Sequence, residues 1–168
     1  MFTHLHLHTE FSLLDGFSRI PQLMERAEQL GQKAIGLTDH GVMYGALQFY
    51  KKARKHGIKP IIGIEAYVAQ SSRHDRTPEA KSPYHMTLLA RNETGYRNLL
   101  ALSTKAHLEG YYYKPRMDKE ILELHPVFLG DGPRIVPGLN RVGRGRGRSR
   151  DGGGSGRWCR RGRGGGNH

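Results

Sequence analysis

The feature that most limits what this chain can fold into is an abrupt change of composition at His125. Residues 126–168 contain 14 of the 23 glycines and ten arginines, but no lysine and only two acidic residues. This stretch offers so little apolar surface that burial could not offset the entropy of ordering its backbone. We therefore predict a folded domain over residues 1–125 and a disordered Gly/Arg-rich tail over residues 126–168.

Three interpretations of this tail remain open. Its net charge is +8, against +4 for residues 1–125, so it could be a flexible arm that contacts nucleic-acid phosphates. It could be a solvated linker without a partner, or a translation of GC-rich DNA in a shifted frame, because G/C-rich codons encode Gly, Arg, Pro and Ala. We favour the shifted frame, since the change interrupts an apparent helix, DKEILELH.

Several classes of protein are excluded by simple counts. The single cysteine rules out a disulfide framework within the chain. No apolar run approaches the roughly 20 residues that cross a bilayer, and the start, MFTHLHLHTE, lacks the basic and then apolar regions of a secretory signal. We expect a cytoplasmic protein with no membrane partner.

Strand-type and helix-type patterns alternate along the first 125 residues. Alternation and short apolar runs predict strands over residues 2–8, 33–37, 58–69 and 84–90. Helical spacing of apolar residues predicts helices over residues 20–30, 43–56 and 93–109, the first capped by Ser18 and ended by Gly31. Strands that alternate with helices favour βα units, a parallel sheet and an α/β fold.

Histidines and acids fall at or near the ends of the predicted strands and in the loops that follow. Functional residues of parallel α/β proteins gather at the C-terminal ends of their strands. The candidates are His6, His8, Asp15, Asp39, His40, Glu65 and His85. Imidazole nitrogens with carboxylate oxygens suit Zn²⁺, Mn²⁺ or Fe²⁺, and a site with two or three such ions could clamp a phosphate and activate water.

The individual signals differ in strength. HLHLH contains two overlapping His-x-His pairs, and position does not choose between the pair that includes His4 and the pair that includes His8. His40 could belong to the start of a helix, and His85 could be a hydrogen-bonded core histidine. Glu65 is the most informative residue, because a charge inside the apolar strand IIGIEAYV needs a partner.

Four segments of the chain together resemble one family: HLHLHTEFSLLDG, GLTDHGVMYGALQFYKKARKHGIKPIIGIEAYVA, YHMTLLARNETGYRNLL and LEGYYYKPRMDKEIL. They are similar to the N-terminal PHP (polymerase and histidinol phosphatase) domain of the bacterial DNA polymerase III alpha subunit. The likeness covers residues 2–125, and GIKPIIGIEAYV and TGYRNLL are typical of the replicase branch. It implies a distorted (β/α)₇ barrel, of which this chain holds roughly the first half, with up to three divalent metals, Zn²⁺ or Mn²⁺, at its rim.

The resemblance also implies a ligand set. Because Thr-x-Phe-Ser follows His8 directly, the family's His-x-His pair falls on His6 and His8. The six metal ligands implied in this chain are His6, His8, Asp15, His40, Glu65 and His85, with Asp39 as a supporting neighbour of His40. Three of the nine family ligands have no counterpart in this chain. Cys159 is not assigned as one of them, because its surroundings, RWCRR, do not match the family's context.

The resemblance implies a function in DNA replication. An intact set of the six ligands resembles the branch whose PHP domain is a metal-dependent phosphoesterase and 3′→5′ proofreading exonuclease, with DNA and other replicase subunits as partners. Because the polymerase palm and three ligands are missing, we expect little or no activity from the chain alone. Two alternatives are a free-standing PHP-family phosphoesterase for small monoesters and a non-enzymatic nucleic-acid binder that acts through the Arg/Gly tail.

Overall fold

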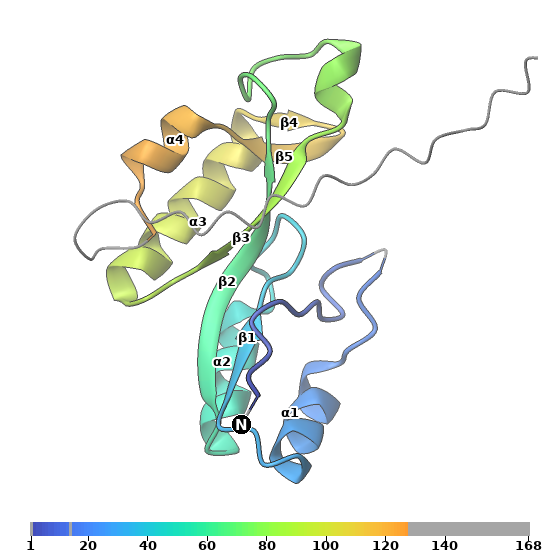
Figure 1. The fold of residues 1–168 in the computed structure, drawn as a ribbon, viewed down its shortest axis with the longest axis vertical. Helices are drawn as coiled ribbons and strands as arrows, with labels where there is room; N and C mark the ends of the chain where they lie inside the picture. The colour runs from blue at the N-terminus through green and yellow to red at the C-terminus, as the bar shows by residue number, and fades with distance from the viewer. Residues whose placement is uncertain (1, 14, 128–168) are drawn as a thin grey trace, which may run out of the picture.

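A computed structural model describes residues 2–13 and 15–127 (Figure 1). The prediction of a disordered tail over residues 126–168 concerns, apart from its first two residues, a stretch outside the described part. The helices of the described part are α1 (Ile20–Gln29), α2 (Ala46–Lys55), α3 (Glu93–Leu108) and α4 (Lys119–Leu124). Its strands are β1 (Ala34–Leu37), β2 (Lys59–Val68), β3 (Tyr84–Leu89), β4 (Tyr111–Tyr112) and β5 (Lys114–Met117). Among the described residues, no helix has the length and apolar character to span a bilayer.

The long strand β2 organises a mixed, partial α/β sheet. β1 pairs with the first half of β2 in parallel, and β5 pairs in parallel with its last two residues. β3 pairs with the second half of β2 in the antiparallel sense, and β4 is antiparallel to β5. The prediction of an all-parallel sheet is therefore wrong. The loop over residues 69–83 between β2 and β3 contains only the short 3₁₀ helix Pro78–Lys81, whereas a parallel return usually runs through an α-helix.

The helices follow the predicted ranges, with two differences. α2 begins at Ala46, three residues later than predicted. α1 is preceded by Arg19, and the predicted cap at Ser18 is wrong. The Ser18 carbonyl instead accepts the backbone N–H of Glu10 at 3.1 Å, so this residue closes the loop before the helix. Gly31 ends α1 with a φ of 65°, a conformation that glycine adopts without strain.

Residues 2–8 do not form the predicted strand. They run beside β1 and make two backbone hydrogen bonds to it, from Gly36 N–H to the His4 carbonyl and from Thr38 N–H to the Leu7 carbonyl. The two acceptors are three residues apart and the two donors only two, so one extra residue disrupts the ladder as in a β-bulge. The hydroxyl of Thr38 accepts the Leu7 N–H at 2.8 Å instead of a backbone carbonyl.

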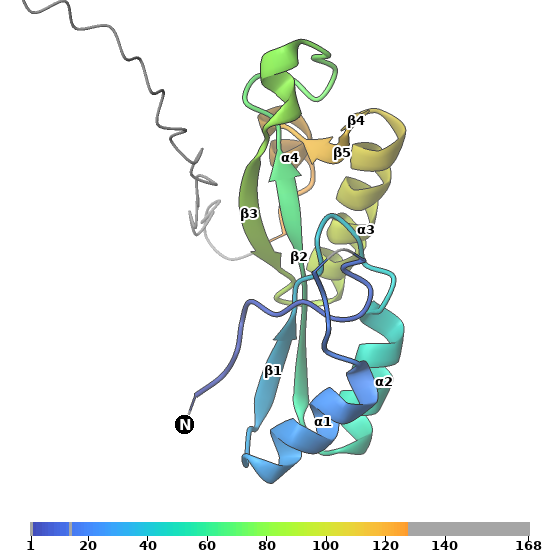
Figure 2. The ribbon, with the colours of Figure 1, turned by 90° about the vertical axis from the view of Figure 1, so that its right-hand side faces the viewer.

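Two apolar clusters form the core. One lies among α1, α2 and β1, and the other joins α3 and α4 to β2, β3 and β5. α1, α2 and α3 lie on the same side of the sheet (Figure 2). Because side chains alternate along a strand, Ile64 and Ala66 enter the second cluster while Glu65 and Tyr67 point to the other face of β2. This alternation places a buried carboxylate away from the apolar core.

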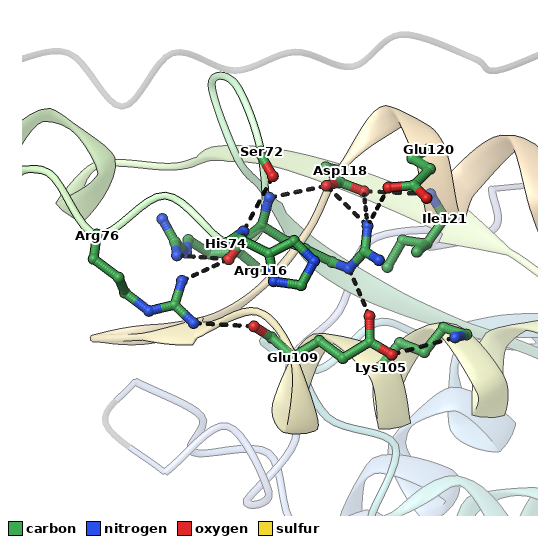
Figure 3. A network of polar contacts seen from close by, with 10 residues as sticks. Ser72, His74, Arg76, Lys105, Glu109, Arg116, Asp118, Glu120 and Ile121 are labelled. Carbon is green, nitrogen blue, oxygen red and sulfur yellow. Dashed lines mark hydrogen bonds and ion pairs between the residues drawn. The ribbon is translucent and has the colours of Figure 1, made fainter.

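A network of ion pairs holds the loop after β2 to the far end of the sheet (Figure 3). The guanidinium of Arg73 donates to both carboxylate oxygens of Asp118, at 3.0 and 3.1 Å, and to Glu109 and Glu120 at 2.7 and 2.8 Å. Asp118 also accepts the Ile121 N–H and so caps α4. These contacts connect the loop, α3 and α4.

Arg116 on β5 is fully buried in the same region. Its guanidinium donates to four backbone carbonyls, those of Ala80, Gly110, Arg73 and Asp75, at 2.7–3.0 Å. Burial lowers the pKa of Arg116 from its usual value. One side chain thus satisfies carbonyls of the loop after β2, including its 3₁₀ helix, and of the turn after α3.

Candidate metal centre

Four imidazoles surround the buried carboxylate of Glu65, whose side chain is only 7% exposed. Oε2 lies 2.7 Å from His6 Nε2, 3.0 Å from His8 Nε2 and 3.5 Å from His40 Nδ1. Oε1 lies 2.6 Å from His85 Nδ1. The structure therefore brings together five of the predicted site residues around one side chain.

These side chains come from four separate pieces of the chain. Glu65 lies in the middle of β2, and His85 lies diagonally opposite on β3, on the same face of the sheet. His40 follows β1 and forms a parallel bridge with Glu65. Gly41 then turns the chain with a φ of 65° and donates its N–H to the Glu65 carbonyl. Backbone pairing thus fixes the relative positions of three site residues.

The irregular segment before Thr9 supplies the other two histidines. Although it is not a regular strand, His6 and His8 still project together, with their Nε2 atoms 3.1 Å apart. His4 does not join them. It is exposed and makes an edge-on contact with the ring of Phe2. The structure thereby favours the His-x-His pair that the resemblance implied.

Asp15 reaches the cluster through His40. Its Oδ2 lies 2.9 Å from His40 Nε2, so a neutral His40 carries its proton on Nε2 and has a lone pair on Nδ1. Burial lowers the pKa of His40 and favours this neutral form. Nδ1 is buried and has no hydrogen-bond partner. A lone pair and a carboxylate oxygen therefore face each other across 3.5 Å.

Asp39 supports the site through a different residue than expected. Its carboxylate, fully buried, accepts hydrogen bonds from the N–H and hydroxyl of Thr9 and from the hydroxyl of Ser12, at 2.6–2.8 Å. It makes no hydrogen bond to the His40 ring within the described residues. Instead, Ser12 Oγ accepts the His40 N–H at 3.1 Å. Asp39 thus anchors the turn that follows His8.

Ser12 also determines which nitrogen of His8 faces the cluster. The single hydroxyl proton of Ser12 is donated to Asp39, so its oxygen can only accept from His8 Nδ1, which lies 3.4 Å away. The proton of a neutral His8 then lies on Nδ1, and its Nε2 lone pair points toward Glu65. Histidine ligands of metals are usually oriented by such a hydrogen bond from the opposite ring nitrogen.

The charge balance of the cluster is set by Glu65. Burial alone would raise the pKa of Glu65, but hydrogen bonds from His8, His6 and His85 outweigh it and hold that pKa well below its usual range. When His8 is protonated, it donates from Nε2 to Glu65, and this hydrogen bond raises the pKa of His8 despite partial burial. The inward lone pair on Nε2 belongs to the neutral ring only. The carboxylate thus stays ionised at neutral pH and attracts positive charge.

Tyr67 closes one side of the cluster. Its ring stacks on His40 with centroids 6.0 Å apart and meets His85 edge-on at 4.9 Å. Burial, reinforced by the charges of Glu65 and Asp15, raises the pKa of Tyr67 to about 12. Tyr67 therefore remains a neutral phenol that shields two imidazoles from solvent.

The donor set fits divalent cations. Two groups of ligand atoms, from His6, His8 and Glu65 and from His40, Glu65 and His85, each lie within 4.8 Å of one another. Ligands at the usual Zn–N and Zn–O distances of tetrahedral zinc are separated by about 3.3 Å, which resembles the spacing in the first group. The unpartnered Nδ1 of His40 is satisfied when a cation lies beside Glu65.

Sequence reasoning missed Ser12 and Tyr67. Ser12 is an ordinary loop residue in the sequence, and its role depends on Asp39, which is 27 positions away. Tyr67 lies two residues after Glu65, so the period of a strand would have placed both on one face. That signal could have identified Tyr67, whereas nothing in the local sequence distinguished Ser12.

Comparisons with known proteins indicate the family of the chain. Residues 4–127 match the PHP domain family. DNA polymerase III subunit alpha of Treponema pallidum is 55% identical over 126 residues, covering 74% of this chain and 11% of the relative, and the same subunit of Borreliella burgdorferi is 51% identical over 124 residues, covering 73% and 11%. An amidohydrolase structure from Chromobacterium violaceum is 21% identical, with a TM-score of 0.43, over 61% of this chain and 34% of that one.

The chain spans about a tenth of the length of the curated relatives that it matches. Within that span, the family match extends from the segment that supplies His6 and His8 to the end of the described residues and covers every side chain of the cluster. The chain therefore belongs to the PHP domain family.

Proposed function

We propose that the cluster around Glu65 binds divalent cations, Mn²⁺ or Zn²⁺, and serves hydrolysis of phosphodiesters. The observation that supports this most directly is the single ionised carboxylate shared by four imidazoles. His6, His8 and Glu65 would hold one ion and His40, Glu65 and His85 another, with Asp15 at the solvent side of His40. The metal identity and the ligand roles are part of this proposal.

Bound ions of this type supply a Lewis acid for a phosphoryl oxygen and lower the pKa of bound water. The chain's own residues prepare the site for them. Glu65 provides the negative charge, Asp15 keeps the His40 proton on Nε2, and Ser12 keeps the His8 proton on Nδ1. Tyr67 excludes water from one side. The inward ring nitrogens are thereby positioned for an ion, which would displace the protons that they donate to Glu65.

We further propose that residues 2–125 are the PHP portion of the alpha subunit of a replicative DNA polymerase III. The 51–55% identity to alpha subunits supports this assignment over a free-standing phosphoesterase. In this proposal the substrate is the 3′ end of DNA, the reaction is 3′→5′ exonucleolytic, other replicase subunits are partners, and the setting is the cytoplasm.

The test combines metal binding and hydrolysis on the whole chain. The protein, stripped of metal, is titrated with Mn²⁺ or Zn²⁺ by calorimetry and then incubated with 3′-labelled single-stranded DNA. We expect saturable metal binding and slow, metal-dependent release of the terminal nucleotide, both greatly reduced in Glu65→Gln. The rate is expected to be low, because only six of the nine ligands implied by the resemblance are matched.

Glu28→Gln is a matched control. Glu28 also binds a histidine, His56, at 2.7 Å, but in an exposed pair outside the cluster. Nucleotide release that survives Glu65→Gln would contradict the proposed function. Turnover of small phosphate monoesters without DNA hydrolysis would favour the free-standing phosphoesterase, and DNA binding that is lost on deleting residues 141–168 would favour the tail-led binder.

A further inference from the structure

A groove of about 530 Å³ adjoins the metal cluster, and its lining includes Asp15, His40 and Tyr67. Its walls come from residues 11–13 and Asp15, from Val42 and Tyr44, and from the β4–β5 hairpin. The volume lies within the roughly 300–1,000 Å³ of small-molecule sites. Any molecule that reaches the cluster from this side must pass the groove.

Exposed tyrosines dominate the groove. Tyr44, Tyr111 and Tyr113 are 66%, 57% and 62% exposed, and all three line it. Tyr113 has a φ of 59°, a conformation that non-glycine residues rarely adopt. Strained backbone conformations occur more often at functional sites than elsewhere in proteins.

The charges at the groove favour an anionic ligand. Lys114 lines it, with its ammonium 5.2 Å from the centre of the Tyr67 ring, and Lys81 approaches the ring of Tyr113 at 4.9 Å. Asp15 is the only acidic side chain among the described residues that line it, and it belongs to the metal cluster. Flat aromatic faces with adjacent cations are typical of surfaces that bind single-stranded nucleic acid.

A second cavity of the protein provides a useful contrast. It is about 480 Å³, lies between α2 and the start of α3, and includes Tyr50 as an exposed ring. It shares no residue with the metal cluster, and Glu93 lies in its wall. An exposed tyrosine in a cavity is therefore not by itself an argument for a binding site. The distinguishing feature of the first groove is its continuity with Asp15 and His40.

We propose that the groove formed by Tyr44, Tyr111, Tyr113 and Lys114 is a stacking subsite for successive bases of single-stranded nucleic acid whose phosphodiester lies at the adjacent cluster. The subsite rests on the proposed function for its position relative to the cleaved bond. The tyrosine faces hold the bases, and Lys114 neutralises a neighbouring phosphate. Stacking tolerates every base, so the subsite gives little sequence preference.

The experiment measures how much the bases contribute to binding. The whole chain is kept in EDTA, and its dissociation constants are measured by fluorescence anisotropy for labelled tetrathymidylate and for a tetranucleotide of the same charge without bases. The ratio of the two constants isolates the base contribution, because phosphate contacts, including those of the Arg/Gly-rich residues, are common to both ligands. Wild-type protein is expected to prefer tetrathymidylate.

The variants then locate that preference. Tyr44→Ala, Tyr111→Ala and Tyr113→Ala are each expected to reduce the ratio by about fivefold or more, as loss of one base–aromatic stack does. The corresponding Phe variants keep the ring and are expected to keep the ratio. Tyr50→Ala is the control in the second cavity. Circular dichroism of each variant establishes that it is folded, and Tyr44→Ala lies outside the strained hairpin.

The outcomes separate this inference from the proposed function. A ratio of one in the wild type, or a ratio that none of the three Ala variants lowers, overturns the subsite. Because binding is measured without metal, a failure of Glu65→Gln to reduce metal affinity would contradict the proposed function alone. Loss of the ratio in the Ala variants, with Tyr50→Ala unchanged, supports the subsite.

Discussion

Two clusters of charged side chains lie along the sheet, and they are built on opposite principles. Around Arg73 and Arg116, every guanidinium contact has a carboxylate or carbonyl acceptor, and the two ends of the network are tied to α3 and α4. Around Glu65, four imidazoles compete for one carboxylate, and one buried ring nitrogen has no partner. The first cluster is complete as it stands, and the second is not.

This difference indicates what each cluster is for. Buried polar groups normally find partners, and an exception indicates a missing ligand or a functional role. The Arg73 network stabilises a loop that has little secondary structure of its own. The Glu65 cluster instead gathers imidazole nitrogens around one ionised carboxylate, a donor set that suits a divalent cation. Changes in the first should alter stability, and changes in the second should alter metal binding.

The largest expected effect is on stability, from Arg116→Met. Methionine fills part of the volume but removes the charged donor shared by four carbonyls. The carbonyls of Arg73 and Asp75 keep Arg76 as a donor and that of Gly110 keeps the Arg116 backbone N–H, whereas that of Ala80 loses its donor. A buried acceptor left unsatisfied costs about 1–3 kcal/mol and a lost hydrogen bond to a charged group about 1.5–3 kcal/mol, so we expect at least about 3 kcal/mol off the free energy of unfolding, measured by urea denaturation. Arg97→Met, at an exposed i,i+4 pair, is the control and should cost less than about 0.5 kcal/mol. Equal urea midpoints for the two variants would show that the hydrogen bonds of Arg116 do not stabilise the fold.

Glu65→Gln is expected to have the largest effect on metal binding. Gln retains the size of the side chain and can hydrogen-bond to the imidazoles, but it removes the charge that both ligand groups share. We expect the affinity for Mn²⁺ or Zn²⁺ to fall more than about 100-fold, beyond the 10–100-fold typical of residues that only orient ligands. The thermal midpoint of the metal-free protein should change less than in Arg116→Met. If calorimetry finds the affinity for Mn²⁺ or Zn²⁺ unchanged, the assignment of metal binding to the Glu65 cluster is contradicted.

Ser12→Ala sharpens the same comparison with a smaller effect. Without the hydroxyl, Asp39 loses one donor and His8 Nδ1 loses its acceptor, so Nε2 is no longer held as the inward lone pair. We expect metal affinity to fall about 10–100-fold. Ser12→Thr keeps the hydroxyl and should restore most of it. An affinity equally low in both variants would indicate that packing around position 12, and not the hydrogen bond, matters.

Some of the site could be predicted from the sequence because its signal is local. Glu65 interrupts an otherwise apolar strand, and His6 and His8 project together after a two-residue step, even though the segment that holds them is not a regular strand. The choice of His8 over His4 required the resemblance, since both alternatives satisfy the same period. The structure agrees with that choice by placing His4 outside the cluster.

Other parts could not be predicted because they depend on contacts between distant segments. The antiparallel direction of β3 depends on how the loop after β2 packs, and Arg73 and Arg116 fix that loop through partners more than 30 positions away. The bulge in residues 2–8 arises from the hydroxyl of Thr38. The support that Asp39 gives to the site likewise runs through Ser12 and not through its neighbour His40.

The smallest expected effect is on the pH dependence of stability. A hydrogen bond from Arg73, with another from Lys105, lowers the pKa of Glu109. A carboxylate with a depressed pKa in the folded state stabilises the fold above its unfolded pKa, near 4.3, and that contribution is lost as the pH falls through the folded value. Glu109→Gln should therefore narrow the difference in stability between pH 6 and pH 3. Because Glu109 is one-third exposed, solvent screens the interaction and the change should be modest.

Urea denaturation at a series of pH values measures this change. The control is Glu123→Gln, which removes an exposed carboxylate on α4. A pH profile that Glu109→Gln leaves identical to the wild type would show that Asp118 and Glu120 alone neutralise Arg73, and that the network contains more negative charge than it needs.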